Sequence, residues 1–176
     1  IHVGDLKSGA TPCTDALMAQ RLALLDASPL PLVFTPGDND WTDCHGARAG
    51  RYDPIERLQH LRELFFPRDE SLGRRRIGLA RQPGRPENVR WSYGGVVFVT
   101  LNVPGSNNNA RMPAERDARM ADNRAWLDAA ARTAAEPEAR ALVVVGHAEP
   151  GFSRGPLRDD AYAAYRAELG AVAVRL

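Results

Sequence analysis

Residues 30–41 read LPLVFTPGDNDW, an apolar run that ends in a glycine and a cluster of acidic and amide residues. The apolar part, Leu30–Thr35, has the length and composition of a buried β-strand, and the Pro-Gly pair after it marks its end. The same order of apolar run, glycine and polar residue recurs at Ile1–Asp5 and at Ala141–His147. We therefore expect three strands, each followed by a loop and a helix, which is typical of an α/β fold with parallel strands.

Three segments between or after these strands have helical patterns. A helix is expected from about Thr14 to Asp26, because its apolar residues recur with helical spacing. A second helix begins after Asp53, which is followed by Pro54 and, in the capping-box position, by Glu56. A third helix is expected from about Pro113 to Ala135. These helices would cover the faces of the sheet.

The remaining chain predicts a hairpin, a loop and one more strand. Arg90–Tyr93 and Val96–Val103 read as strands joined at a Gly-Gly turn, and Pro104–Met112 reads as a loop. The apolar segment Ala171–Leu176 reads as a strand that enters the fold, just as Ile1–Val3 reads as the last part of another strand. The sequence therefore looks trimmed at both ends, and residues 1–176 are expected to form a single, partial domain.

The composition is that of a globular domain and narrows the choice of partners. With 176 residues, 44% hydrophobic and 26% charged, the chain suffices for one domain with a core of normal density. No apolar run approaches the ~20 residues that a membrane-spanning helix needs. A formal net charge of +1 gives no reason to expect nucleic acid or an anionic membrane surface as a partner.

The chain has two cysteines, Cys13 and Cys44, and two interpretations of them remain open. They are either buried thiols in a reduced cytoplasmic protein or one disulfide, since each closely follows an acidic glycine loop and we expect these two loops to lie side by side. A disulfide would indicate a periplasmic or secreted protein. An upstream signal peptide would lie outside this sequence, so localisation stays open.

Three polar side chains are expected at one edge of the sheet. Asp5, Asp38 and His147 each follow an apolar strand by one or two residues, and ligand sites in α/β sheets gather where loops leave the carboxyl ends of strands. Carboxylates and imidazoles that converge from several loops bind divalent cations, and an adjacent glycine lets backbone approach the ligand. The alternative is that the aspartates form turns or caps and the histidine is structural.

These residues resemble the calcineurin-like metallophosphoesterase family. Gly4-Asp5 matches the second block of the family pattern, Gly37–Asp40 resembles the Gly-Asn-His-Glu/Asp block that comes next, and His147 fits the single histidine of the fourth block. The first block, Asp-x-His, and the last, Gly-His-x-His, would lie outside residues 1–176. A bacterial subgroup with GDNEW followed by TDCH is closer still, because Gly37–His45 reads GDNDWTDCH and Val103–Asn108 also matches.

The resemblance implies a layered sandwich of β-sheets flanked by helices, and two divalent ions (Mn, Fe or Zn) that hydrolyse a small phosphoester. Asp5 would bind both ions, and Asp38 and His147 would bind the second. Asn39 stands where the family has the histidine that assists the leaving group, so we assign it a place in the catalytic site. His45, on the same loop, is the candidate to replace that histidine, by position alone.

Two other functions compete with the phosphoesterase. The first is a non-catalytic descendant that keeps the scaffold for binding, and Asn39 in place of the histidine favours it. The second is a Gly-Asp-Ser-type serine esterase, because Gly37–Asp40 also fits its Gly-x-Asn-Asp block. That family needs a serine directly after its first Gly-Asp, where this chain has Leu6, and an Asp-x-x-His after His147, which this chain lacks. We rank the esterase last.

Overall fold

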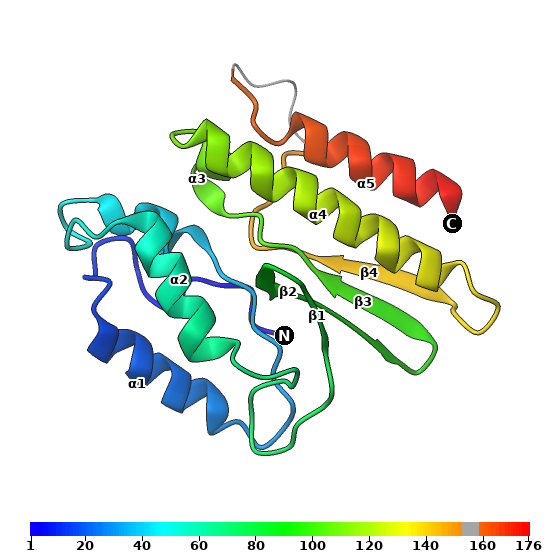
Figure 1. Ribbon diagram of the computed structural model, residues 1–176, viewed down its shortest axis with the longest axis horizontal. Helices are drawn as coiled ribbons and strands as arrows, with labels where there is room; N and C mark the ends of the chain where they lie inside the picture. Colours follow the sequence, from blue (N-terminus) through cyan, green and yellow to red (C-terminus); the bar gives the residue numbers. More distant parts are fainter. Residues whose placement is uncertain (153–158) are drawn as a thin grey trace.

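The computed structural model describes residues 1–152 and 159–176 (Figure 1). Its centre is a four-stranded sheet in the order β1-β2-β3-β4, in which β3 and β4 are parallel and the other neighbours antiparallel. The strands are β1 (Ala80–Gln82), β2 (Arg85–Tyr93), β3 (Val96–Thr100) and β4 (Ala141–Val145). Helices pack beside this mixed sheet, which confirms the α/β class.

The first half of the chain forms two helices beside a pair of extended segments. Helix α1 (Asp15–Asp26) begins at Thr14, whose hydroxyl accepts a hydrogen bond from the Leu17 amide, and α2 (Pro54–Phe65) begins at Asp53, whose carboxylate accepts two. Both starts are as predicted, because capping side chains satisfy amides that have no helical partner. The apolar faces of the two helices share one buried cluster with Phe34.

Two predicted strands, at Ile1–Val3 and Leu30–Thr35, are only extended segments. They run side by side in parallel, and the His2 amide and carbonyl bond to Val33 and Thr35 at 2.8 and 3.0 Å. The ladder stops there because the next two amides bond to side chains instead, that of Gly4 to His2 Nδ1 at 3.2 Å and that of Gly37 to Asp40 Oδ2 at 2.8 Å. The predicted geometry, with both segments ending at the same edge, is nevertheless present.

The predicted hairpin forms, with different limits. Strand β2 starts at Arg85 rather than at Arg90, β3 ends at Thr100 rather than at Val103, and β1 adds an antiparallel neighbour that was not predicted. Gly94 and Gly95 join β2 to β3 with φ of 58° and 78°, a conformation that suits a two-residue hairpin turn.

The second half of the chain covers the sheet with α4 (Pro113–Ala134) and α5 (Ala163–Arg175), which lie side by side in Figure 1. The prediction of α4 is confirmed to within one residue, but the strand predicted at Ala171–Leu176 is wrong, since most of it belongs to α5. Tyr165 and Val172 are buried against the α4 side of the core, and such a helical stripe is invisible in six residues read alone.

The predicted loop Pro104–Met112 contains a short element, α3 (Gly105–Asn109), whose residues Ser106 to Asn109 have φ between 51° and 57°. This is one left-handed turn, and asparagine tolerates that conformation better than most residues. The buried amides of Asn108 and Asn109 hold it, the first bonding to the Ala161 carbonyl at 3.1 Å and the second to Glu115 at 2.7 Å.

Candidate metal centre

Asp5, Asp38 and His147 lie together, and one ligand atom from each falls within 4.8 Å of the others. Imidazole Nε2 of His147 is 3.0 Å from Oδ1 of Asp38 and 3.7 Å from Oδ1 of Asp5. The exposed fractions of the side chains are 36% for Asp5, 17% for Asp38 and 18% for His147. The group is thus half-buried at the surface, open to a small ion or substrate.

Glycines make this close approach possible. A Cβ added at Gly37 would lie closer than 3.0 Å to Asp5 and His147, and one added at Gly105 would come equally close to the carboxylate of Asp38. Gly4, with φ of 91°, passes so near the Gly37 backbone that a side chain there would also collide. Two carboxylates and an imidazole in a cradle that a methyl group would fill form a donor set that suits a divalent cation.

The imidazole of His147 is oriented as a ligand would be. Its Nδ1 faces the backbone carbonyl of Val3, and its Nε2 faces Asp38. Metal-binding histidines commonly donate the other ring N–H to a carbonyl in this way, which leaves one nitrogen for the ion. With acceptors on both sides, the bond to Asp38 raises the pKa of His147 to about 9, although burial opposes this. The same hydrogen bond lowers the pKa of Asp38.

Asp40 anchors the two acidic loops to each other, a role that the sequence did not predict. Its carboxylate accepts hydrogen bonds from the backbone amides of Asp5, Leu6 and Gly37 at 2.8–2.9 Å. The side chain is buried, and burial raises its pKa to about 6 against the opposing effect of the amides. An aspartate three residues after a glycine looks like any turn, so only the tertiary contact reveals its function as an anchor.

Asn39 contacts Asp5 rather than open solvent. Its side-chain Nδ2 donates to Oδ2 of Asp5 at 2.7 Å, and its backbone amide donates to Oδ1 at 3.2 Å. The disulfide between Cys13 and Cys44 lies directly behind it, with both sulfurs within 3.8 Å of the Asn39 carbonyl oxygen and the Cα atoms 5.7 Å apart. Of the two interpretations of the cysteines, the paired one is therefore confirmed.

His45 lies beside the centre but not in it. It ends the short helix η2 (Thr42–His45), where its Nδ1 is 2.7 Å from the Thr42 carbonyl and its Nε2 meets Arg111. In the described part of the chain, His45 makes no hydrogen bond or ion pair with Asp5, Asp38 or His147. Ser106 connects η2 to the centre, because its hydroxyl is 2.8 Å from Asp43 and 3.3 Å from Asp38. The sequence did not single out Ser106 or Arg111.

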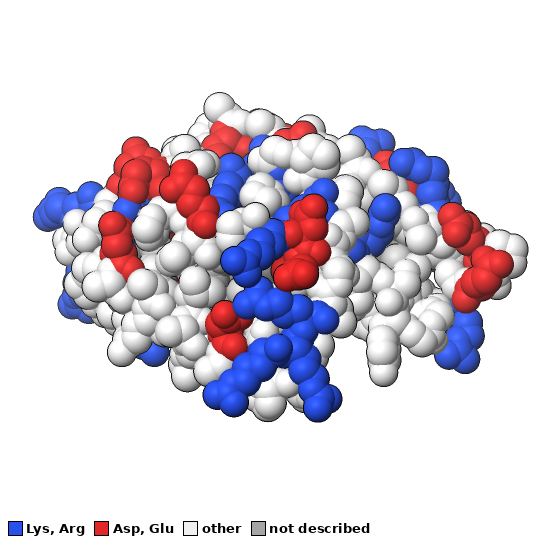
Figure 2. All heavy atoms as spheres, turned by 60° about the horizontal axis from the view of Figure 1, so that its bottom comes forward, with Lys and Arg blue, Asp and Glu red and all other residues white. Residues whose placement is uncertain are grey.

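A basic loop that contains Arg74, Arg75 and Arg76 lies away from these residues (Figure 1). All three side chains are exposed. The loop runs along the bottom of Figure 1, and Figure 2 turns that side forward to show basic side chains gathered with acidic ones beside them. Arg76 pairs with Asp26 at 2.9 Å. This pairing offsets part of the local positive charge.

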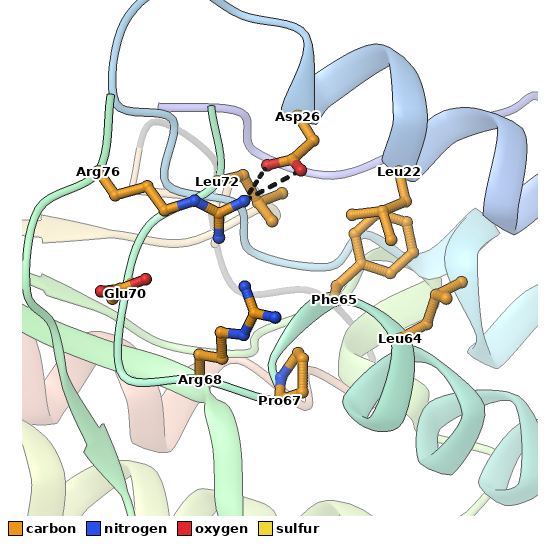
Figure 3. Close-up of a pocket in the computed structure, with 9 residues that line it drawn as sticks. All are labelled: Leu22, Asp26, Leu64, Phe65, Pro67, Arg68, Glu70, Leu72 and Arg76. Carbon is orange, nitrogen blue, oxygen red and sulfur yellow. Dashed lines mark hydrogen bonds and ion pairs between the residues drawn. The ribbon is translucent and has the colours of Figure 1, made fainter. Parts of the chain in front are cut away.

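A cavity of about 210 Å³ adjoins this loop (Figure 3). Phe65 and Leu72 form part of its apolar floor, and Arg68 and Arg76 extend over it. Its described lining contains no histidine, cysteine or serine, and shares no residue with the candidate centre. Size alone therefore does not make it the reaction site.

No helix in the described residues is both long and apolar enough to cross a membrane. Comparison of the chain with protein-family models, curated proteins and solved structures found no match. Any function assigned to the chain therefore rests on its own residues and their geometry.

Proposed function

We propose that this chain supplies part of a binuclear metal centre that hydrolyses a small phosphoester, on a layered sandwich of the calcineurin-like metallophosphoesterase type. The observation that carries the proposal is the convergence of Asp5, Asp38 and His147, with the Val3 carbonyl on the far nitrogen of the imidazole. A histidine that merely fills space needs no carboxylate on one nitrogen and no carbonyl on the other.

The ligand atoms indicate which metal ions suit the centre. Carboxylate oxygens and imidazole suit Mn, Fe or Zn alike, and Asp5 would hold both ions while Asp38 and His147 hold the second. When bound, the ions would polarise the phosphoester and activate the attacking water. By the resemblance, the other ligands would belong to Asp-x-His and Gly-His-x-His blocks outside residues 1–176.

Asn39 and His45 have different proposed roles at the centre. Asn39 holds the Asp5 carboxylate through two hydrogen bonds, and because an amide does not release a proton at neutral pH, it positions groups rather than acting as an acid. His45 remains the proposed source of the proton for the leaving group, a role in which its Nε2 would have to carry the proton and exchange Arg111 for the leaving group.

Elemental analysis tests the proposal most directly, on purified protein that includes the flanking blocks. We expect about two transition-metal ions per chain, followed by turnover of phosphodiester or phosphomonoester substrates. Asp38→Asn and His147→Ala should each lower metal content and turnover. His60→Ala is the matched control, since His60 lies near Asp15 and away from the centre. A protein without bound metal after incubation with Mn and Fe would refute the metal centre.

A non-catalytic scaffold remains the second candidate, and a specific contact favours it. Asn39, at the position where the resemblance places the leaving-group histidine, donates its side-chain N–H to the Asp5 carboxylate and offers no acid in its place. Bound metal without turnover of any phosphoester would select this alternative. The serine esterase has less support, because Leu6 follows Asp5 where that mechanism needs its nucleophile.

The disulfide bears on where the protein works. Disulfides persist in oxidising compartments and are rare in the reduced cytoplasm. The bond between Cys13 and Cys44 is buried, with neither side chain exposed. We propose that the protein is periplasmic or secreted. Mass spectrometry of protein alkylated in cell extracts tests this, since free thiols at both positions in the native host would contradict it.

A further inference from the structure

A second cavity, of about 180 Å³, borders the candidate metal centre. Its walls come from η2 and from the segment after the left-handed turn, and they include His45, Asp43, Ser106, Arg111 and Met112. A cavity of this size has room for a small organic fragment.

One side chain joins this cavity to the metal centre. The Ser106 hydroxyl lines the cavity and lies 3.3 Å from Oδ2 of Asp38, one of the three candidate ligands. It also lies 2.8 Å from both carboxylate oxygens of Asp43. The left-handed conformation of Ser106 and the three residues after it is costly for residues other than glycine, and such conformations cluster at functional sites. A group bound beside Ser106 is thus adjacent to anything held at Asp38.

Two charged side chains line the cavity, Asp43 and Arg111, and no ion pair joins them in the described part of the chain. The carboxylate of Asp43 already accepts hydrogen bonds from Ser106 and from Thr42, the latter at 3.3 Å. Arg111 is exposed, and among the described residues it pairs with no carboxylate. Among the same described residues, the side chain of Arg111 bonds only to Nε2 of His45. Since the other ring nitrogen of His45 donates to the Thr42 carbonyl, that Nε2 accepts from Arg111 and neutralises nothing.

An unpaired guanidinium at the mouth of a small cavity favours an oxyanion. Arginine presents several N–H donors in a planar fork that matches carboxylate and phosphate. Pro54 and Met112 supply apolar wall beside it, where the carbon skeleton of a ligand would pack. The cavity therefore combines one anion-binding group with a short apolar surface, next to a centre that would hold a phosphoryl group.

We propose that this cavity is a leaving-group subsite, in which Arg111 binds a carboxylate or phosphate carried by the alcohol part of the ester. The inference rests on the proposed function and makes it more specific. The substrates are phosphoesters with a second oxyanion, and Arg111 selects them over esters of uncharged alcohols.

Matched substrates test the subsite. Phenyl phosphate is compared with 4-carboxyphenyl phosphate, and propyl phosphate with propane-1,3-diyl bisphosphate, so that the two pairs distinguish carboxylate from phosphate recognition. We expect the wild type to favour at least one charged member by about 10-fold or more in kcat/KM, the range for a charge-assisted hydrogen bond. Arg111→Ala should reduce that preference to about twofold or less, and Arg111→Lys should restore part of it.

The control is Arg116→Ala, since Arg116 lies in α4, pairs with Asp117 and does not line the cavity. It should keep the wild-type preference. Equal preference in the wild type and in Arg111→Ala would overturn the subsite, even if both proteins hydrolyse phosphoesters.

Binding without turnover separates this inference from the proposed function. Calorimetry with 4-hydroxybenzoate and with inorganic phosphate reports on the cavity whether or not the protein is an enzyme. If wild type binds one of them about 10-fold or more tightly than Arg111→Ala does, the anion site stands even when no phosphoester is cleaved. If neither anion distinguishes the two proteins, the site is refuted whatever the activity.

Discussion

At the scale of single residues, His147 is constrained at both of its ring nitrogens. Its Nδ1 faces a carbonyl that only a donor satisfies, and its Nε2 faces the Asp38 carboxylate at 3.0 Å. A proton therefore occupies Nε2 when no cation is bound, which is why the pKa of this imidazole rises to about 9. A metal ion has to displace that proton, because a ligating imidazole is neutral.

The first prediction is that Mn²⁺ affinity depends steeply on pH. With the pKa of His147 at about 9, the apparent association constant should rise by up to about tenfold per pH unit between pH 7 and pH 9 and then level off. Competition with a chromophoric chelator measures it. His147→Gln should bind more weakly and lose most of the slope. An affinity that is flat from pH 7 to pH 9 in the wild type would show that Nε2 carries no proton to displace.

A second prediction for a single residue concerns Asp40 and the pH dependence of stability. Burial raises its folded-state pKa from an ordinary value of 3.8 to about 6, so the folded protein binds a proton that the unfolded chain has lost. The slope of the free energy of unfolding against pH is therefore negative for this group. The Asp40 contribution to that free energy falls as pH rises from about 4 to about 6. By linkage, the fall is at most about 3 kcal/mol.

Urea unfolding of the wild type and of Asp40→Asn, each from pH 4 to pH 7, isolates this contribution as a difference between two curves. The variant should lack the fall while other groups titrate equally in both proteins. It should also be less stable at pH 4, because one amide oxygen replaces a carboxyl group that serves three backbone donors. Parallel curves would mean that Asp40 titrates normally.

At the scale of elements, the sequence predicted whatever depends on local pattern. The starts of α1 and α2 follow from Thr14 and Asp53, and β4 follows from its continuous apolar run. The proximity of Asp5, Asp38 and His147 was predictable because strand ends meet at one edge of a sheet. These inferences needed no knowledge of distant contacts.

The features that the sequence did not predict depend on tertiary contacts. Residues 171–176 are apolar enough for a strand, but their burial follows the stripe that packs beside α4. The left-handed turn is held by Asn108, whose side-chain oxygen accepts from Arg119 at 2.8 Å across eleven positions of sequence. The roles of Asp40 and Ser106 likewise exist only once loops from different parts of the chain touch.

The disulfide gives a third prediction, because it joins the loop before α1 to η2. Its closed loop spans a sequence separation of 31, for which chain entropy gives a stabilisation of about 3–4 kcal/mol. The paired variant Cys13→Ala with Cys44→Ala should lose about that much in urea unfolding. It should also disturb the centre, because the sulfurs pack against the Asn39 carbonyl and Asn39 holds Asp5. Weaker Mn²⁺ binding by the variant, at a concentration of denaturant where it is still folded, reports this second effect.

At the scale of the whole molecule, two apolar clusters meet across a layer of buried polar side chains. One cluster contains α1, α2 and Phe34, and the other contains α4, α5 and the inner face of β3. Between them, Glu87 accepts a two-point ion pair from Arg62 and a hydrogen bond from Asn102. Such a layer favours one fit of the halves, because these bonds form only when Arg62 and Asn102 both meet Glu87.

The candidate centre crosses the same boundary, since Asp5 and Asp38 belong to the first half and His147 follows β4 in the second. An ion bound to all three therefore binds the folded molecule and not the unfolded chain, in which the ligands are far apart. By mass action, Mn²⁺ at about 100 times its dissociation constant should stabilise the fold by about 2.7 kcal/mol. For a chain of this size, that corresponds to a rise in Tm of roughly 5–10 °C.

Thermal unfolding with Mn²⁺ and with a chelator is the measurement. Asp38→Asn should abolish most of the rise because it removes a ligand charge, while His60→Ala should keep it, since His60 is remote from the centre. A wild-type Tm that stays constant while elemental analysis finds bound ions would place those ions at ligands that do not join the two halves. Asp5, Asp38 and His147 would then be neighbours by packing alone, and the centre would have to be sought elsewhere.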